Sequence, residues 1–222
     1  MLLWGGNEIE EMGLFYLIKI GENKYMDKLY MRGLIHMKNI DWFRKYEDKK
    51  IRGDKDEGIN GIEQIAELKL LLPDGKVLGR SNSAQLKFHD YGKKGNLYSM
   101  IAITSREDPE KFRIDERNKE LGDCFVVIIN VEEFIKRIEK KLNELGYEYE
   151  YSLVNYYDSK SYHGTLNVFC KPIEFNYQKE FRFWVRRNEA ETLEFEIGSI
   201  EDIALIYDIE KLDKISIKHI KK

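Results

Sequence analysis

The chain has 222 residues, 42% of them hydrophobic, which is enough for a substantial core. Charged residues of both signs make up 35% and the net charge is -3, so net charge does not indicate binding to nucleic acid. The sequence contains no apolar run of about 18 residues that would indicate a membrane span. Cys124 and Cys170 form neither a disulfide framework nor a metal-ligand pattern. These properties predict a cytoplasmic protein with no membrane association and no metal site.

The N-terminal part of the chain predicts a regular alternation of strands and helices. The segments are a buried strand at 14–20, a helix at 22–31, a short strand at 34–37 and a second helix through Tyr46. Gly33 is placed to end the first helix in the left-handed conformation. Asn39 or Asp41 would cap the second helix.

The middle of the chain is more ambiguous. Residues 62–72 suit either a helix or a long strand, and the turn sequence at 73–76 would make a hairpin if its neighbours are strands. Residues 81–95 predict loops, and the highly charged residues 106–121 predict a surface excursion. Buried strands are expected at 97–104 and 124–130.

The clearest helix is predicted at 131–145, where Gly146 would end it. Its apolar stripe consists of Phe134, Ile135, Ile138, Leu142 and Leu145. An extended aromatic segment is expected at 147–157, and residues 192–197 are expected to pair with the strand that precedes them. Residues 200–206 and 215–217 would close the chain. The absence of repeats and linkers predicts one α+β domain over residues 1–222.

Residues 177–185 alternate between two faces, which is typical of a β-strand. Gln178, Glu180 and Arg182 share one face, at a spacing of about 6.6–7 Å between same-face residues. An amide, a carboxylate and a guanidinium would then line one cleft. The alternative is an exposed polar face with a simple contact between Glu180 and Arg182.

The order of a Lys19-bearing strand, a helix, a Gly33-Leu34 strand and a late Gln178-x-Glu180 strand resembles the ADP-ribosyltransferase fold. The resemblance implies a split, mostly antiparallel sheet with flanking helices around a cleft. In that family a basic or polar residue on the first strand holds NAD, and a late glutamate engages the nicotinamide ribose.

The resemblance gives each candidate residue a role. Glu180 would face the ribose and Gln178 the acceptor, while Lys19 or Arg182 would hold the pyrophosphate. His36 or Tyr30 would pack on the nicotinamide or the ribose. NAD would be the substrate, and positive charge on the ribose would be stabilised by the carboxylate.

The sequence departs from the family pattern at two places. Under this resemblance the protein would therefore be either an active transferase or an inactive relative that binds a ligand in the cleft. The first strand offers Tyr16 or Lys19 where Arg or His is usual. In place of a Ser-Thr-Ser motif or a Tyr, the candidates are His36 and Thr104-Ser105.

Most of the chain also resembles an uncharacterised bacterial and phage family, which carries no activity with it. The pattern consists of Trp42-Phe43-Arg44, Gly53-Asp54-x-x-Glu57-Gly58, the strand at 101–105, Lys171 and Tyr177-Gln178-Lys179-Glu180-Phe181-Arg182. Together the two resemblances predict an ADP-ribosyltransferase-like protein of bacterial or phage conflict systems, active as a toxin or in anti-defence.

Two other functions remain open from the sequence. The first is a phage-encoded inhibitor without enzymatic activity, which binds a host defence protein through aromatic residues concentrated at 147–162. The second is a metal-dependent nuclease, in which Asp54, Asp56 and Glu57 or the Glu67-Leu68-Lys69 pattern would hold Mg²⁺. Nothing in the sequence indicates an oligomeric state.

Overall fold

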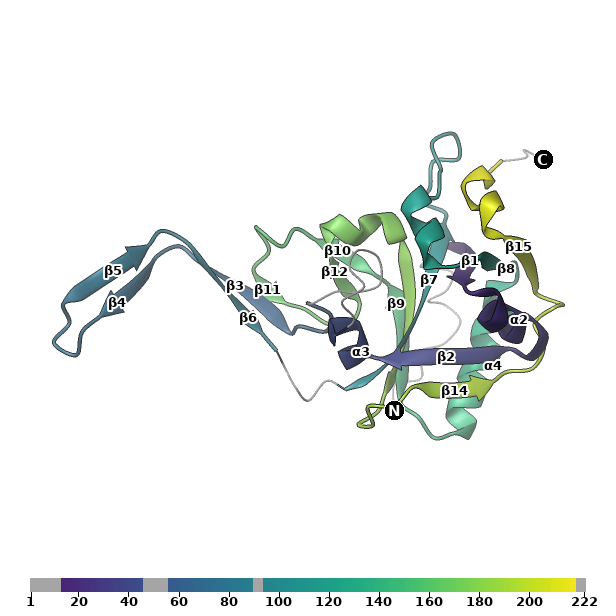
Figure 1. The fold of residues 1–222 in the computed structure, drawn as a ribbon, viewed down its shortest axis with the longest axis horizontal. Helices are drawn as coiled ribbons and strands as arrows, with labels where there is room; N and C mark the ends of the chain where they lie inside the picture. Colours follow the sequence, from purple (N-terminus) through teal and green to yellow (C-terminus); the bar gives the residue numbers. More distant parts are fainter. Residues whose placement is uncertain (1–12, 46–55, 90–93, 219–222) are drawn as a thin grey trace.

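The computed structural model describes residues 13–45, 56–89 and 94–218. It combines helices and strands, and the strands form mostly antiparallel sheets (Figure 1). The strands are β1 (Leu14–Gly21), β2 (Leu34–Asn39), β3 (Gly61–Ile65), β4 (Leu68–Leu71), β5 (Val77–Ser81), β6 (Ala84–Phe88), β7 (Gly95–Thr104), β8 (Cys124–Ile128), β9 (Tyr149–Leu153), β10 (Asn155–Tyr157), β11 (Gly164–Thr165), β12 (Cys170–Pro172), β13 (Glu180–Arg186), β14 (Leu193–Glu196) and β15 (Ala204–Asp208). The α-helices are α2 (Asn23–Arg32), α3 (Ile40–Lys45) and α4 (Val131–Glu144), and the 3₁₀ helices are η1 (Glu116–Leu121), η2 (Ile173–Gln178) and η3 (Ile209–Lys214).

The largest sheet divides along one edge of β7. On one side, β7 pairs with β13 from Gly95 to Ile101. On the other side, its C-terminal part pairs with β1, while only Asn96 and Leu97 pair with β2. Residues 98–100 therefore face a gap between β1 and β2. These two strands are connected in the chain by α2. This gap positions the candidate site described below.

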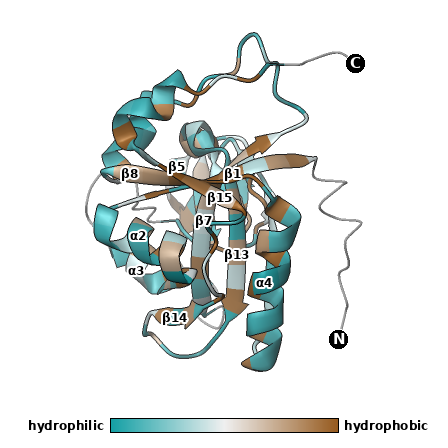
Figure 2. Ribbon diagram, turned by 90° about the vertical axis from the view of Figure 1, so that its right-hand side faces the viewer, coloured by the Kyte–Doolittle hydropathy of each residue, from teal (hydrophilic) through white to brown (hydrophobic). Residues whose placement is uncertain are grey.

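The main core lies between this sheet and α4, which contacts β1 (Figure 2). Four residues of the predicted stripe are buried, whereas Leu145 is the C-cap residue and is 45% exposed. Asn130 caps the helix by accepting a hydrogen bond from the Glu133 N–H. The predicted helix is thus confirmed, apart from its last residue.

The predicted N-terminal elements are also confirmed. Gly33 has φ 62°, and its N–H donates to the carbonyls at the end of α2, as expected of a left-handed C-cap. The Asn39 side chain accepts a hydrogen bond from the Asp41 N–H at 2.8 Å, so Asn39 is the residue that caps α3. Tyr46 lies outside the described residues.

The ambiguous middle segment is made of strands. Residues 62–72 contribute to β3 and β4, and the turn at 73–76 closes a hairpin between β4 and β5. The loops predicted at 81–95 are wrong in part, because β6 pairs with β3 there. The surface excursion predicted at 106–121 is also wrong in part, because Phe112 and Ile114 are buried in a second core cluster.

One pairing predicted near the C-terminus is wrong. Residues 192–197 were expected to pair with the preceding strand, but β14 pairs with β2, where Phe195 faces Ile35. This difference reflects long-range pairing, which the local pattern of residues does not encode. Of the two segments expected to close the chain, 200–206 leads into β15, which pairs with β8 at the edge of the main sheet, and 215–217 follows η3 without forming a strand.

One hairpin projects away from the rest of the molecule (Figure 1). Its base is the β3–β6 pair, which also contacts β11, and its outer part is the two-stranded β4–β5 sheet. We call residues 66–83 the arm. None of the helices in the described ranges has the length and apolar content needed to cross a bilayer.

Candidate functional site

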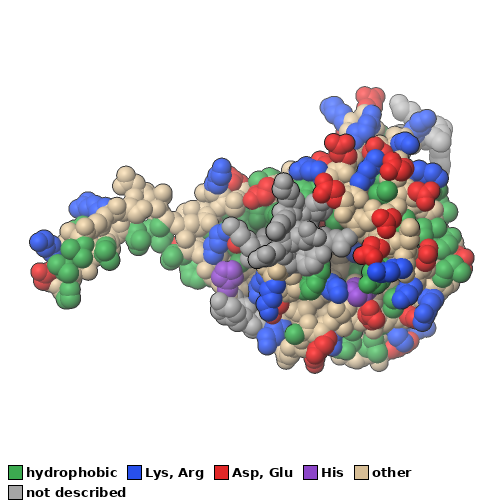
Figure 3. Space-filling model, in the orientation of Figure 1, with side chains coloured by type: hydrophobic (Ala, Val, Ile, Leu, Met, Phe, Trp, Pro, Cys, Tyr) green, Lys and Arg blue, Asp and Glu red, His purple; other side chains and the backbone are tan. Residues whose placement is uncertain are grey.

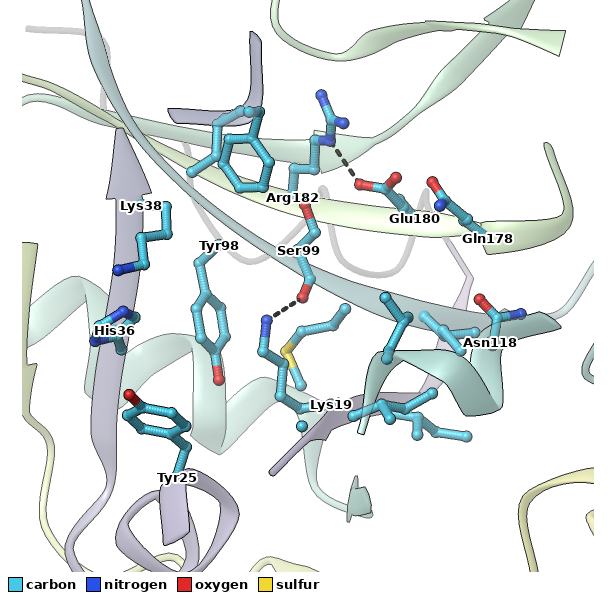
Figure 4. A pocket seen from close by; sticks show the side chains of 18 of the residues that line it. Lys19, Tyr25, His36, Lys38, Tyr98, Ser99, Asn118, Gln178, Glu180 and Arg182 are labelled. Carbon is cyan, nitrogen blue, oxygen red and sulfur yellow. Dashed lines mark hydrogen bonds and ion pairs between the residues drawn. The ribbon is translucent and has the colours of Figure 1, made fainter. Parts of the chain in front are cut away.

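A pocket of about 380 Å³ lies at the gap where the main sheet divides (Figure 4). Its walls come from β1, β2, β7, β13 and α2, with further residues from α3, η1, η2 and β12. Segments far apart in the chain therefore meet around one cavity. The residues inside it fall into a central lysine, an ionic cluster at one end and an aromatic group at the other.

Lys19 occupies the centre of the pocket. Beyond Ile18, β1 no longer pairs with β7, and the Lys19 ammonium donates a hydrogen bond to the Ser99 carbonyl oxygen at 2.7 Å. The same ammonium lies 4.1 Å from the centroid of the Tyr98 ring. This cation thus satisfies a backbone acceptor that faces the gap in the sheet.

A buried ionic cluster forms one end of the pocket. The Glu180 carboxylate accepts hydrogen bonds from Lys171 and from Arg182, each at 2.7 Å. Arg182 in turn donates to both carboxylate oxygens of Glu57, at 2.7 and 2.9 Å. Lys171 also donates to the Gln178 side-chain oxygen at 2.5 Å. Two cations and two carboxylates are paired, so the cluster carries no net charge.

The cluster fixes the ionisation of its central members. Burial alone would raise the pKa of Glu180, but the charges and hydrogen bonds of Arg182 and Lys171 outweigh it and hold that pKa well below the ordinary value of 4.5. Burial would likewise lower the pKa of Arg182, but Glu180 and Glu57 raise it above the ordinary value. Glu180 is therefore a carboxylate acceptor near neutral pH.

Arg44 holds the segment that carries Glu57. Its guanidinium donates to the backbone oxygens of Glu57 and Gly58, at 2.6 and 3.1 Å. Gly58 adopts φ 68°, a left-handed conformation that favours glycine. The separate parts of the sequence pattern, around residues 44, 57–58, 171 and 178–182, thus converge on one cluster. Gly53 and Asp54 of that pattern lie outside the described residues.

The other end of the pocket is aromatic and cationic. The rings of Tyr25 and His36 lie 5.6 Å apart between centroids. The His36 Nδ1 atom contacts a Glu194 carboxylate oxygen at 2.5 Å. Lys38 lies 5.5 Å from the centroid of the Trp42 ring. This end therefore offers flat surfaces for a ring and one cation, Lys38, for an anion.

The structure brings together five of the six predicted site residues. Those that line the pocket are Glu180, Gln178, Lys19, His36 and Arg182. Tyr30 does not line it; it packs against the main core, and its backbone oxygen accepts from the Ile200 N–H. Of the alternatives, Tyr16, Thr104 and Ser105 are also not among the lining residues.

Gln178 reaches the pocket by a route that the sequence did not predict. It is the last residue of η2, not part of the strand, and Lys179 after it adopts φ 44°. The chain turns there, and β13 begins at Glu180. The predicted alternation therefore begins at Glu180, with Phe181, Phe183 and Val185 in the main core on the opposite face, and Gln178 lies outside it. The side chains of Gln178, Glu180 and Arg182 nevertheless line the same cavity.

Sequence reasoning missed two polar groups of the pocket. Asn118 and Tyr98 are buried at 0% and 3% exposure, and both line the cavity. The Asn118 side-chain oxygen and the Tyr98 hydroxyl have no hydrogen-bond partner among the residues that the structure describes. Tyr98 belongs to an apolar strand, and Asn118 to a charged segment without periodicity, so neither carried a local signal.

The acidic residues proposed as metal ligands have other partners. Asp56 pairs with Lys87 at 2.5 Å, and Glu57 pairs with Arg182. Glu67 pairs with Lys69 and Arg80 on the arm. Within residues 13–45, 56–89 and 94–218, there is no group of three or more side chains suited to hold a metal ion.

Comparison of the chain with protein-family models, curated proteins and solved structures gives no match. The chemistry of the pocket is therefore the basis for assigning a function.

Proposed function

We propose that this is an ADP-ribosyltransferase-like protein of bacterial or phage conflict systems that binds NAD in its pocket and has lost most transferase activity. The observation that carries the proposal is the convergence of Glu180, Gln178, Lys19 and His36 on one cavity at the division of an antiparallel sheet. The family resemblance implies these four residues, although His36 lies at the end of the cavity opposite Glu180 and so away from the proposed nicotinamide ribose.

The pocket matches the parts of a dinucleotide in order. Lys19, in the centre, would bind the pyrophosphate, while Tyr25 and Trp42 offer ring surfaces at one end. At the other end, Glu180 would accept a hydrogen bond from the nicotinamide ribose. A carboxylate has about four lone-pair sites, and Lys171 and Arg182 occupy two of them, so Glu180 retains acceptor capacity.

The ionic cluster argues for binding without efficient turnover. Cleavage of the bond between nicotinamide and ribose leaves positive charge on the ribose, which a carboxylate stabilises only if its own charge is not offset. Two cations lie within 2.7 Å of the Glu180 oxygens, and the four-residue cluster is neutral. Glu180 would therefore bind the ribose hydroxyl but stabilise the transition state weakly.

Calorimetric titration with NAD, combined with measurement of nicotinamide release, tests both parts of the proposal. We expect saturable binding by the unmodified protein and by Glu174→Gln, a control on an exposed residue of η2. We expect weaker binding by Glu180→Gln and nicotinamide release close to background in all three. Absence of binding would refute NAD as the ligand. Nicotinamide release that depends on Glu180 would show that the protein cleaves NAD, with the ADP-ribosyl group passing to water or to an acceptor, and would refute the loss of activity.

The arm favours a second candidate function, a non-enzymatic inhibitor that binds a host defence protein. The tyrosines expected to form a binding surface are largely packed, since Tyr149 and Tyr151 contact the main core and Tyr157 is buried. The arm, in contrast, exposes Leu70 by 64% and Leu78 by 56%. Figure 3 shows its hydrophobic side chains gathered along one side, which suits an apolar protein partner.

Removal of the arm separates this candidate from NAD binding. The full chain, immobilised and exposed to host lysate, would retain one partner in stoichiometric amount, and a chain lacking residues 66–83 would not. The purified partner should then bind the full chain alone. If both chains retain the partner, or neither does, the arm is not the binding element.

A further inference from the structure

Asn118 is held in one orientation by its own hydrogen bonds. Its side-chain amide group donates to the backbone oxygens of Asp115 and Tyr177, at 3.1 and 3.2 Å. Both partners are carbonyl oxygens, so only the amide nitrogen of Asn118 can bond to them. In a flipped side chain the Asn118 oxygen would face these two carbonyl oxygens, and no hydrogen bond could form. The side-chain oxygen is therefore directed away from them, and it has no partner in the described part of the chain.

Asn118 lies at the end of the pocket that holds the ionic cluster, and its side-chain oxygen is buried there. Figure 4 shows Asn118 at the same end of the pocket as Gln178 and Glu180, and all three line the cavity. The Gln178 oxygen and both Glu180 oxygens already accept hydrogen bonds from cations. Asn118 thus supplies an uncharged acceptor that no protein donor among the described residues uses, and buried acceptors are normally satisfied.

The neighbouring lining indicates what kind of ligand group fits there. Ile101 and Leu121 contribute apolar surface to the same cavity, and Leu121 belongs to η1 together with Asn118. An uncharged group with an N–H donor, carried on a flat ring, would satisfy the acceptor and cover the apolar surface. A carboxylate in the same place would set two acceptors against each other.

We propose that Asn118 selects the ligand by accepting a hydrogen bond from a neutral carboxamide group on the ligand's ring. The pocket would then discriminate a nicotinamide from a nicotinate. This inference rests on the proposed function, because it assumes that the nicotinamide end of NAD lies beside Glu180. It adds a residue that determines specificity and that lies outside the Gln-x-Glu segment.

The test compares NAD with nicotinic acid adenine dinucleotide, in which a carboxylate replaces the carboxamide. Calorimetric titration of the full chain should give an affinity for NAD at least about tenfold higher, since a site built to accept a hydrogen bond rejects a ligand that lacks the donor. Equal affinities would overturn the inference while leaving NAD binding intact. If neither dinucleotide binds, the proposed function fails, and the inference fails with it.

Two variants test whether Asn118 is the residue that discriminates between the two dinucleotides. Asn118→Ala should bind NAD about tenfold more weakly and should no longer distinguish the two dinucleotides. Asn60→Ala is the matched control, because the Asn60 side-chain oxygen is also buried without a partner in the described ranges but does not line the pocket. It should keep the preference for NAD. A preference that survives in Asn118→Ala would overturn the inference. If that variant does not fold, the comparison on the unmodified chain still decides.

Discussion

Arg182 and Glu57 lie 125 residues apart in the chain and meet through two parallel hydrogen bonds, at 2.7 and 2.9 Å. Each of the two side chains is only 2% exposed. This forked geometry is the strongest form of an ion pair between a guanidinium and a carboxylate. It fixes the segment around Glu57 against β13 and so closes one wall of the pocket.

Removal of Glu57 should destabilise the protein strongly. In Glu57→Ala, Glu180 would be the only carboxylate left in the cluster for the two buried cations, Arg182 and Lys171. Breaking a buried ion pair costs about 3–5 kcal/mol of stability. Urea unfolding measures the change, with Glu63→Ala, an exposed residue of β3, as the control. A loss below about 1 kcal/mol would mean that the cluster reorganises freely and does not hold the pocket wall.

The ionic cluster also predicts how stability depends on pH. The pKa of Glu180 is lowered in the folded state, so the unfolded chain binds more protons wherever the pH lies between the folded pKa and about 4.5. The contribution of Glu180 to stability is therefore fully present above about pH 5 and is lost as the pH falls through the folded pKa.

Urea unfolding between about pH 3 and pH 7 tests this dependence. The free energy of unfolding should fall more steeply on acidification in the unmodified protein than in Glu180→Gln. Other carboxylates contribute equally to both curves. Parallel curves would show that Glu180 has an ordinary pKa in the folded protein.

Lys19 should contribute both to ligand binding and to the stability of the fold. Lys19→Met would remove the cation proposed to bind the pyrophosphate and leave the Ser99 carbonyl without that donor, at a cost of about 1–3 kcal/mol in stability. NAD binding should fall at least about tenfold, because a charge-assisted hydrogen bond contributes about 1.5–3 kcal/mol. Lys136→Met, on α4 away from the pocket, is the control. Unchanged NAD affinity in Lys19→Met would remove Lys19 from the site.

The arm should be dispensable for the rest of the fold. Ile65 and Ala84 face each other in the β3–β6 pair, so an Asn-Gly turn can replace residues 66–83. Because the arm buries little apolar surface, the free energy of unfolding should change by less than about 1 kcal/mol. Circular dichroism and urea unfolding check this expectation. Loss of cooperative unfolding would show that the arm supports the body.

The fold was predictable where local chemistry decides the structure. The apolar stripe of α4, the Gly33 cap and the buried strand β7 follow from periodicity and capping alone. The strand pairings did not follow, because the partner of β14 depends on a contact with β2 that is distant in sequence.

The candidate site was predictable from the local pattern only where its residues are close together in the sequence. The Gln178, Glu180 and Arg182 side chains share one pocket as expected, although a positive φ at Lys179 replaces the regular strand. Glu57 was considered as a metal ligand in one alternative, and its contact with Arg182 was not predicted because the two residues lie 125 positions apart in the chain. Asn118 was overlooked because its role depends on where the backbone oxygens of Asp115 and Tyr177 lie.

A crystal structure of the full chain with NAD tests the central claim most directly. The account predicts NAD in the cavity at the division of the sheet, with a nicotinamide-ribose hydroxyl within hydrogen-bond distance of Glu180 and the pyrophosphate beside Lys19. A cavity that stays empty at saturating NAD, or NAD bound elsewhere on the protein, would contradict it.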